Sequence, residues 1–329
     1  MITRKQICIT GATGLIGSEL IKELLKTKNN KIRVLTRKAG VSFPPAVDIL
    51  IGNLACKKDL ESFLHQCDVL YHCAGELTNI SLMRSTHIDG TSNLLELAAD
   101  EFKRTNKKIH WVQLSSCGAY GPPRDKVSQK RVISEKTPTN PFSEYEITKT
   151  LSDELVVLAQ QSEMLTYSIL RPSNVFSQNM SNQPLDKLVK VIQSKIFFYI
   201  GKPGAIANYI HCDDVVNALI KIGSDPKAIN EMYNISSDCS YEELVEEICK
   251  ISEIKKPIIR VPSALIIKPL SILNFLLKKW IHIPELNALS LRTTYPLTKI
   301  ETELNFQLTK KMPFGIIELI GSTPTPQLP

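Results

Sequence analysis

The segment ITGATGLIG, residues 9–17, constrains the fold of this chain more than any other. Gly11, Gly14 and Gly17 lie where a short apolar run ends and a segment with apolar residues at helical spacing begins. Glycines there permit a tight turn and close backbone approach to a ligand, and the free N–H groups of a helix N-terminus bind a pyrophosphate. Because the segment opens a strand–helix–strand unit, the sequence predicts a dinucleotide site.

The rest of the first half continues this alternation of strands and helices. Apolar runs at 31–36, 47–52, 68–75, 108–116 and 165–171 alternate with helical periodicity at 15–27, 57–66, 91–102 and 145–161. Such alternation predicts an α/β fold, a Rossmann-type doubly wound parallel sheet with right-handed crossovers. We expect residues 1–172 and 206–240 to form this core, 173–205 and 241–320 a smaller C-terminal substrate lobe, and 321–329 a tail.

Charge and cysteine content exclude several classes of protein. Forty Lys and Arg against thirty-three Asp and Glu give a net charge of +7 without a dense cluster, so nucleic acid is not an expected partner. The eight cysteines form no Cys-x-x-Cys pair and lie mostly in apolar runs, which predicts buried free thiols and no metal site. We find no signal peptide and expect a cytoplasmic protein.

The most apolar later stretch, residues 264–277, is interrupted by Lys268 and Pro269 and is too short to span a bilayer of about 30 Å. Residues 262–280 could instead lie on a membrane surface, with Lys278 and Lys279 at the headgroups. Packing of this segment within the substrate lobe is the interpretation we favour.

The end of the second strand bears on the choice of cofactor. An NAD site usually has an acid there for the ribose 2′-hydroxyl, whereas this chain has Thr36 followed by Arg37 and Lys38. Two cations suit a 2′-phosphate, so the sequence favours NADP over NAD. A solvated basic turn is the alternative interpretation.

The candidate chemistry lies at the carboxyl edge of the sheet. Ser115 and Ser116 end the fifth strand, and some thirty residues later Tyr145 and Lys149 share one face of a helix. An ammonium group favours a phenolate, and lowering the pKa of a phenol by two to three units needs about 3–4 kcal/mol. A second pair, Tyr295 and Lys299, has the same spacing. Pro296 follows Tyr295 directly and disfavours α geometry at Tyr295, so we predict that this pair is structural.

Together these motifs resemble the extended short-chain dehydrogenases/reductases of the NAD(P)-dependent epimerase/dehydratase type. The similar segments run in the family's order over residues 5–220: TGATGLIG, GNL, DVLYHCAG, GTSNLLELA, SSCGAYG, YEITK, LRPSNVF and YIHCDDVVNAL. The resemblance implies that Tyr145 is the acid–base, that Lys149 lowers its pKa and holds the nicotinamide ribose, and that Ser116 binds the substrate oxygen. Ser116 is chosen over Ser115 because it stands four places before Tyr120 of the AYG motif.

The resemblance also implies the residues that bind ligands. Cofactor contacts fall on Gly11, Thr13, Gly14, Leu15, Ile16, Gly17, Arg37, Asn53, Leu54, Ala74, Gly75, Tyr145, Lys149 and Pro172. Substrate contacts fall on Ser116, Asn174 and Arg292, the last as a candidate for a substrate diphosphate.

Three positions depart from the family's usual pattern. Asn53 replaces an adenine-contacting Asp and can still accept a hydrogen bond from adenine. His87 replaces a common Asn, as either a proton relay or, as we favour, a buried hydrogen-bonded histidine. Cys117 and Gly118 replace the Asp-Glu of sugar-nucleotide dehydratases, which argues against 4,6-dehydration.

The resemblance therefore predicts hydride transfer with a nucleoside-diphosphate sugar, as a 4-keto-sugar reductase or a 4-epimerase, in surface-polysaccharide biosynthesis. A hydroxysteroid- or dihydroflavonol-type reductase is an alternative, and a non-catalytic NAD(P)-binding scaffold is an alternative of another class. Family members often pair the helices at 91–102 and 145–161 across a two-fold axis, so we expect a homodimer.

Overall fold

The computed structural model describes residues 5–27, 29–123, 129–180, 184–262, 265 and 290–320. Most of the segment considered for a membrane surface, residues 266–280, lies outside the described residues. Within the described ranges, no helix has both the length and the hydropathy that crossing a membrane requires.

The helices and strands follow the alternation expected from the sequence. The helices are α1 (Leu15–Leu25), α2 (Ile80–Arg84), α3 (Gly90–Thr105), α4 (Glu144–Gln160), α5 (Pro184–Gln193), α6 (Cys212–Ile222), α7 (Tyr241–Ile251), α10 (Thr298–Leu304) and α11 (Ile317–Ile320). The strands are β1 (Lys5–Thr10), β2 (Asn30–Thr36), β3 (Val47–Ile51), β4 (Val69–His72), β5 (Ile109–Leu114), β6 (Arg131–Val132), β7 (Leu165–Pro172), β8 (Asn174–Phe176), β9 (Tyr199–Ile200), β10 (Ile206–His211), β11 (Glu231–Ile235), β12 (Ser237–Ser240), β13 (Arg260–Val261) and β14 (Thr293–Thr294).

Seven parallel strands form the central sheet in the order β11–β7–β5–β4–β1–β2–β3. The predicted Rossmann-type doubly wound sheet is thereby confirmed. The strand order reverses between β1 and β4, which pair from Ile7 with Val69 to Thr10 with His72. Connections on either side of such a reversal leave to opposite faces, which opens a crevice at the carboxyl edge. The glycine turn after Thr10 lies at this crevice.

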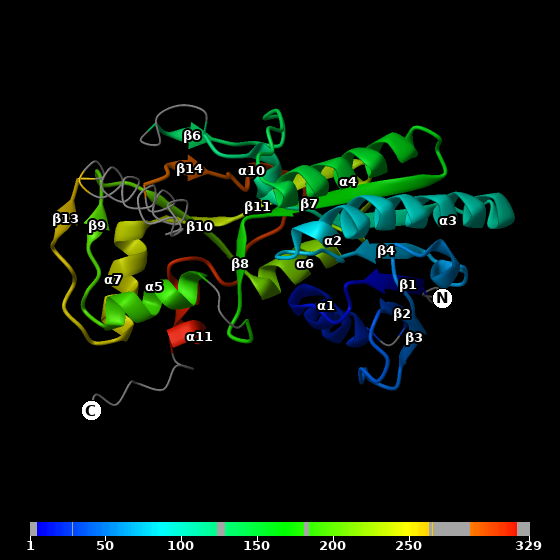
Figure 1. The fold of residues 1–329 in the computed structure, drawn as a ribbon, viewed down its shortest axis with the longest axis horizontal. Coiled ribbons are helices and arrows are strands. Elements are labelled where there is room, and N and C mark those ends of the chain that lie inside the picture. The colour runs from blue at the N-terminus through cyan, green and yellow to red at the C-terminus, as the bar shows by residue number, and fades with distance from the viewer. Residues whose placement is uncertain are drawn as a thin grey trace.

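Helices cover both faces of the sheet (Figure 1). On one face, α1, α6 and α10 pack against β1, β2 and β11 in a single cluster of buried apolar side chains. On the other face, α3 and α4 pack around Trp111 of β5, which is fully buried. Burial of both faces explains why the core strands are apolar runs rather than alternating patterns.

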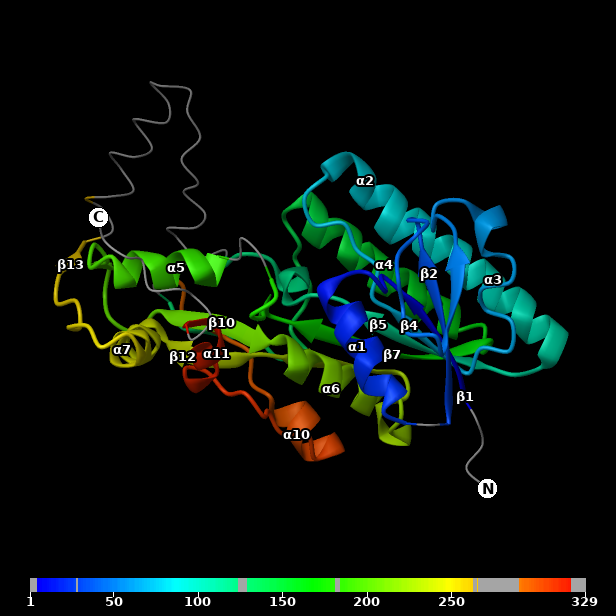
Figure 2. The same cartoon turned by 90° about the horizontal axis from the view of Figure 1, so that it is seen from below.

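A smaller lobe has its own apolar cluster, in which α5, α7 and α11 pack against β10 and β12. Figures 1 and 2 show α5, α7, β9 and β13 together at the end of the molecule away from α3. Strand β8, which pairs with β10, begins two residues after β7 ends. The lobe therefore starts directly at the carboxyl edge of the main sheet, beside the crevice.

Part of the stretch assigned to the substrate lobe packs on the core instead. Ile300, Leu304, Phe306 and Leu308 belong to the same buried cluster as α1 and α6. Lys299 of α10 forms an ion pair of 2.6 Å with Glu231 of β11. The end of the described chain thus supports the far edge of the sheet, while the exact domain boundaries stay a prediction.

Two local expectations have different outcomes. Residues 57–66, expected to form one helix, make only a short 3-10 turn from Lys57 to Leu60 and then irregular turns. The Asp59 carboxylate accepts the backbone N–H of Asn53 at 2.9 Å, which ties this turn to the loop after β3.

All eight cysteines are free and six are buried, as the sequence predicted.

Candidate active site

The turn after β1 forms a cradle that has no room for side chains. Gly11 has a φ of 70°, and a Cβ on it would lie 2.6 Å from the backbone of Cys73. A Cβ on Gly17 would lie 2.2 Å from the carbonyl oxygen of Gly11. Helix α1 begins with no side-chain cap and no acidic residue in its first turn, so its N–H groups are available to an anion.

Two adjoining cavities open from this cradle. The smaller, of about 190 Å³, extends to the ends of β2 and β3 and is lined by Arg37 and Asn53. The larger, of about 400 Å³, extends to the end of β5 and is lined by Ser116, Tyr145 and Lys149. The glycine turn lines both, as do the residues after β4. These residues fit NAD(P), because the cradle would hold the pyrophosphate and each cavity one half of the dinucleotide.

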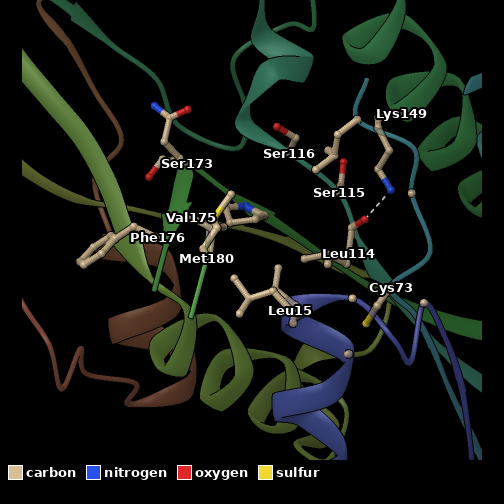
Figure 3. Close-up of a pocket in the computed structure, with 18 of the residues that line it drawn as sticks. Leu15, Cys73, Leu114, Ser115, Ser116, Lys149, Ser173, Val175, Phe176 and Met180 are labelled. Atoms are coloured by element: carbon tan, nitrogen blue, oxygen red, sulfur yellow. Dashed lines mark hydrogen bonds between the residues drawn. The ribbon is translucent and has the colours of Figure 1, made fainter. Parts of the chain in front are cut away.

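Helix α4 presents Tyr145 and Lys149 to the larger cavity one turn apart. A capping box fixes the start of the helix, since the Ser143 hydroxyl accepts the N–H of Glu146 and the Glu146 carboxylate accepts the N–H of Ser143. The Nζ of Lys149 is buried and donates to the carbonyl oxygen of Leu114 at 2.6 Å (Figure 3). This bond ties α4 to the end of β5.

The protonation of Tyr145 differs from what the sequence led us to expect. Burial, together with the negative charges of Asp153 and Glu146, outweighs a hydrogen bond with the Ser116 hydroxyl and raises the pKa of Tyr145 to about 12. The expectation that Lys149 lowers the pKa of Tyr145 is therefore wrong for the protein without bound ligands. Burial also lowers the pKa of Lys149, and its ammonium is engaged by the Leu114 carbonyl rather than by the phenol.

The two adjacent serines have different partners. The Ser115 Oγ donates to Asp153 Oδ2 at 2.6 Å and is buried. The Ser116 Oγ accepts the N–H of Gly118 at 3.0 Å and also bonds the Tyr145 side chain. Both serines line the larger cavity, but the Ser115 hydroxyl is engaged by Asp153, whereas the Ser116 hydroxyl lies beside the phenol. This geometry favours Ser116 as the ligand of a substrate oxygen.

His87 is locked as a neutral ring against this site. Its Nε2 accepts the N–H of Glu76 at 2.8 Å, so Nδ1 carries the proton and donates to the Thr148 hydroxyl at 2.8 Å. Burial first, and then the Lys149 charge, lower the pKa of His87 to about 3. The ring meets Tyr145 edge-on, with centroids 5.8 Å apart. His87 is thus buried and hydrogen-bonded, as we favoured from the sequence.

All the predicted cofactor contacts line one of the two cavities. The smaller cavity is lined by Thr13, Arg37, Asn53 and Leu54, the larger by Leu15, Ile16, Gly17, Tyr145, Lys149 and Pro172, and both by Gly11, Gly14, Ala74 and Gly75. Of the predicted substrate contacts, Ser116 and Asn174 line the larger cavity. Arg292 lines neither, and its guanidinium donates to the carbonyl oxygen of Pro203. The roles of these residues stay predictions.

The second tyrosine–lysine pair is not brought together. Tyr295 precedes α10, and its N–H donates to Asp238 at 2.6 Å. Lys299 pairs with Glu231 and lies 4.8 Å from the ring centre of Tyr233. Neither residue lines the larger cavity.

Sequence reasoning missed the wall opposite Tyr145 and the carboxylate behind it. Val175 and Met180 lie across the cavity from the serines and Lys149, and Phe176 lines the same side with its ring directed away from them (Figure 3). Val175 and Phe176 lie within the LRPSNVF motif, next to Asn174, but they were assigned no role, and Met180 follows in a segment without helical or alternating periodicity. Asp153 was detectable, because it continues the four-residue spacing of Tyr145 and Lys149 along α4.

A family model described as NAD dependent epimerase/dehydratase family matches residues 7–236. The chain belongs to this family. The family predicted from the motifs is therefore confirmed, and this member carries the family's sheet with the glycine cradle and the Ser116, Tyr145 and Lys149 side chains at one edge.

Relatives of this family member include enzymes of two kinds. UDP-glucose 4-epimerase from Vibrio cholerae is 25% identical over 259 residues, covering 74% of this chain and 75% of that protein. dTDP-glucose 4,6-dehydratase from Haemophilus influenzae is 27% identical over 279 residues, covering 75% and 79%. The crystal structure of UDP-glucuronic acid 4-epimerase from Bacillus cereus in complex with NAD has a TM-score of 0.72 at 18% identity over 96% of both chains, which shows a common fold.

Proposed function

We propose that this family member is an NADPH-dependent reductase of a nucleoside-diphosphate 4-keto sugar, with Tyr145 as proton donor. The observation that carries the proposal is one continuous cavity lined by the glycine cradle at one end and by Ser116, Tyr145 and Lys149 at the other. When bound, the reduced nicotinamide supplies the hydride. Ser116 holds the carbonyl oxygen, Tyr145 delivers a proton to it, and Lys149 holds the nicotinamide ribose.

Tyr145 can supply the proton that reduction requires. Its phenol is protonated at neutral pH, and it lies beside Ser116 in the larger cavity, so a proton is available next to the expected place of the carbonyl oxygen. A carbonyl that gains a hydride needs this donor, because the developing alkoxide must be protonated.

The charge of the smaller cavity supports NADP. Arg37 lines it, and its described lining contains no Asp or Glu to accept a ribose 2′-hydroxyl. A guanidinium is suited to bind a 2′-phosphate, and this lining holds no carboxylate that would repel the phosphate.

Dehydration is not proposed for this chain. The described lining of the larger cavity contains no carboxylate, so elimination of water has no acid–base pair there. At the position after Ser116, the Cys117 thiol is buried and donates to the carbonyl oxygen of Arg171.

The direct test is an assay for reduction of UDP-, dTDP- and GDP-linked 4-keto sugars. The loss of NADPH absorbance measures the rate, and product analysis identifies the sugar that is formed. We expect turnover with at least one sugar, faster with NADPH than with NADH, and about 10²–10⁴-fold slower in the Tyr145→Phe variant. Equal rates in wild type and variant would contradict the assignment.

A 4-epimerase is the second candidate, and similarity to the two epimerases above supports it. An epimerase retains a tightly held NAD, whereas a reductase releases its oxidised cofactor. NAD(H) that co-elutes with the purified protein, together with sugar epimerisation without added cofactor, would favour this candidate over the reductase.

The apolar wall of the larger cavity keeps the hydroxysteroid- or dihydroflavonol-type alternative open to test. Val175, Phe176, Met180 and Leu185 suit an apolar substrate, and Arg292 does not line the cavity to meet a diphosphate. Apolar ketones therefore belong in the same assay as the sugars, and turnover of ketones alone would select this alternative.

We further propose that the protein works in the cytoplasm, in polysaccharide biosynthesis, as a homodimer joined through α3 and α4. An exposed leucine near the end of α4, Leu158, supports the dimer proposal. Sedimentation of the wild type and of Leu158→Glu tests it, and a monomeric wild type would contradict it.

A further inference from the structure

One carboxylate joins the three core elements that surround the candidate chemistry. Asp153 lies one turn beyond Lys149 on α4, and its side chain is 2% exposed. Its Oδ2 accepts the Ser115 hydroxyl from the end of β5 at 2.6 Å. The same oxygen accepts Nε and Nη2 of Arg171, at the end of β7, at 3.2 and 3.0 Å. Asp153 thus links the helix of Tyr145 to the end of β5, before Ser116, and to the end of β7, which includes Pro172.

The second carboxylate oxygen points to a role beyond this link. Oδ1 of Asp153 is buried and has no hydrogen-bond partner among the described residues. A buried acceptor without a partner is costly, and it is tolerated where its charge is needed. The fully buried group that gains from a negative charge here is Lys149, whose pKa is lowered by burial and raised by Asp153.

The other groups near Lys149 do not provide this charge. Burial lowers the pKa of His72 and of His87, and it raises the pKa of Cys73 to about 12, so all three are neutral at pH 7. Arg171 of β7 contacts Asp153 as a second cation. Tyr120 lies behind Arg171, whose guanidinium is 5.2 Å from the centre of its ring, and burial raises the pKa of this phenol, so it is neutral at pH 7.

Glu146 and Glu76 act elsewhere. The Glu146 carboxylate is engaged at the start of α4, and Glu76 accepts three hydrogen bonds within its own loop. Among the described residues, Asp153 is therefore the anion that balances two buried cations, Lys149 and Arg171.

We propose that Asp153 is a positioning residue of the hydride-transfer site, which fixes the Ser115–Ser116 turn and the end of β7 against α4 and places a negative charge one turn from Lys149. The inference rests on the proposed function for its kinetic readout. Asp153 touches neither cofactor nor substrate in this role; it acts through Ser115 and Lys149.

Two variants separate the charge of Asp153 from its bond to β5. Asp153→Asn keeps the shape and removes the charge, whereas Ser115→Ala keeps the charge and removes the bond. For Asp153→Asn, we expect the high-pH limb of kcat/KM for reduction to move to lower pH, because loss of the negative charge lets Lys149 and Tyr145 lose their protons more readily. For Ser115→Ala, we expect a lower kcat with the limb unmoved.

A third variant reverses the sign and guards against a fold that does not tolerate Asp153→Asn. Arg171→Gln removes the competing cation, so Asp153 acts on Lys149 alone and the limb should move to higher pH. Asp153→Glu should restore part of the wild-type profile. A uniform loss of activity with unmoved limbs in Asp153→Asn, or a downward shift in Arg171→Gln, would overturn the inference.

The effect of Asp153 on pH dependence can also be measured without a substrate. We expect the affinity for NADPH, measured by nicotinamide fluorescence, to fall with rising pH at a lower pH in Asp153→Asn than in wild type. If the protein binds NADPH with this dependence but reduces no substrate, the proposed function fails and the inference stands. If NADPH binding has the same pH dependence in both proteins, the inference fails.

Discussion

The imidazole of His87 and the hydroxyl of Thr148 form a buried hydrogen bond of 2.8 Å that joins the π-helical segment between α2 and α3 to α4. Thr148 in turn donates to the carbonyl oxygen of Glu144 at 2.7 Å. With Nε2 occupied by the N–H of Glu76, the ring has no place for a second proton unless one of these bonds breaks.

This locked ring predicts a specific pH dependence of stability. The folded-state pKa of His87 is about 3, below its ordinary value of 6.5, so the unfolded chain binds the proton first as pH falls. Stability from this group is present above pH 6.5 and is lost toward pH 3, at about 1.4 kcal/mol per pH unit.

Chemical denaturation of wild type and His87→Asn between these pH values should therefore give a shallower dependence for the variant. His65→Gln, at an exposed histidine, is the matched control and should keep the wild-type slope. Parallel curves for wild type and His87→Asn would contradict the locked ring.

Tyr145→Phe should remove the proton donor while leaving the cofactor bound. We expect kcat/KM for reduction to fall by about 10²–10⁴-fold. NADPH binding, followed by fluorescence, should change little because the phenol contributes one contact among many. Tyr295→Phe, in the second tyrosine–lysine pair, is the control and should retain full activity; equal losses in both variants would count against the assignment.

Arg37→Asp should exchange the cofactor preference. Loss of a charged hydrogen bond to the 2′-phosphate, at about 1.5–3 kcal/mol, predicts roughly 10- to 100-fold weaker NADPH binding, and the new carboxylate can accept the 2′-hydroxyl of NADH. Lys38 does not line the smaller cavity, so Lys38→Asp should have a smaller effect. A wild type that prefers NADH, with no change in Arg37→Asp, would refute the NADP proposal.

Gly17→Ala should disrupt the cradle sterically. Its Cβ would meet the Gly11 carbonyl oxygen at 2.2 Å, and both groups belong to backbone that packing holds in place. We expect a loss of about 1–3 kcal/mol in unfolding free energy, together with loss of cofactor binding. Gly40→Ala, at a positive φ but with no atom within 4 Å, should cost stability without affecting binding.

The core was predictable from sequence because each of its parts has a local signal. Buried parallel strands are continuous apolar runs, and the cradle needs glycines at fixed places, as Gly11 and Gly17 show. The segment at 57–66 was mispredicted because a local hydrogen bond, from the Asn53 backbone to the Asp59 carboxylate, holds the start of the segment in a 3-10 turn.

The pKa shifts in the site were less predictable than the identity of the residues that line it. Spacing along α4 correctly brought Tyr145 and Lys149 to one cavity. The direction of the Tyr145 pKa depends on how far burial outweighs nearby charge, and burial is a property of the assembled fold. Phe176, which lines the cavity, belongs to the apolar cluster of the smaller lobe. How this lobe packs beside the sheet cannot be predicted from a local sequence pattern.

The return of α10 to the sheet has a consequence for synthesis of the protein. The apolar layer beneath β11 is completed by Leu304, Phe306 and Leu308, which leave the ribosome after all seven strands of the main sheet. A nascent chain that ends before these residues must keep Tyr233 and its neighbours partly uncovered. Chaperone contact during translation is therefore expected to concentrate on this last face.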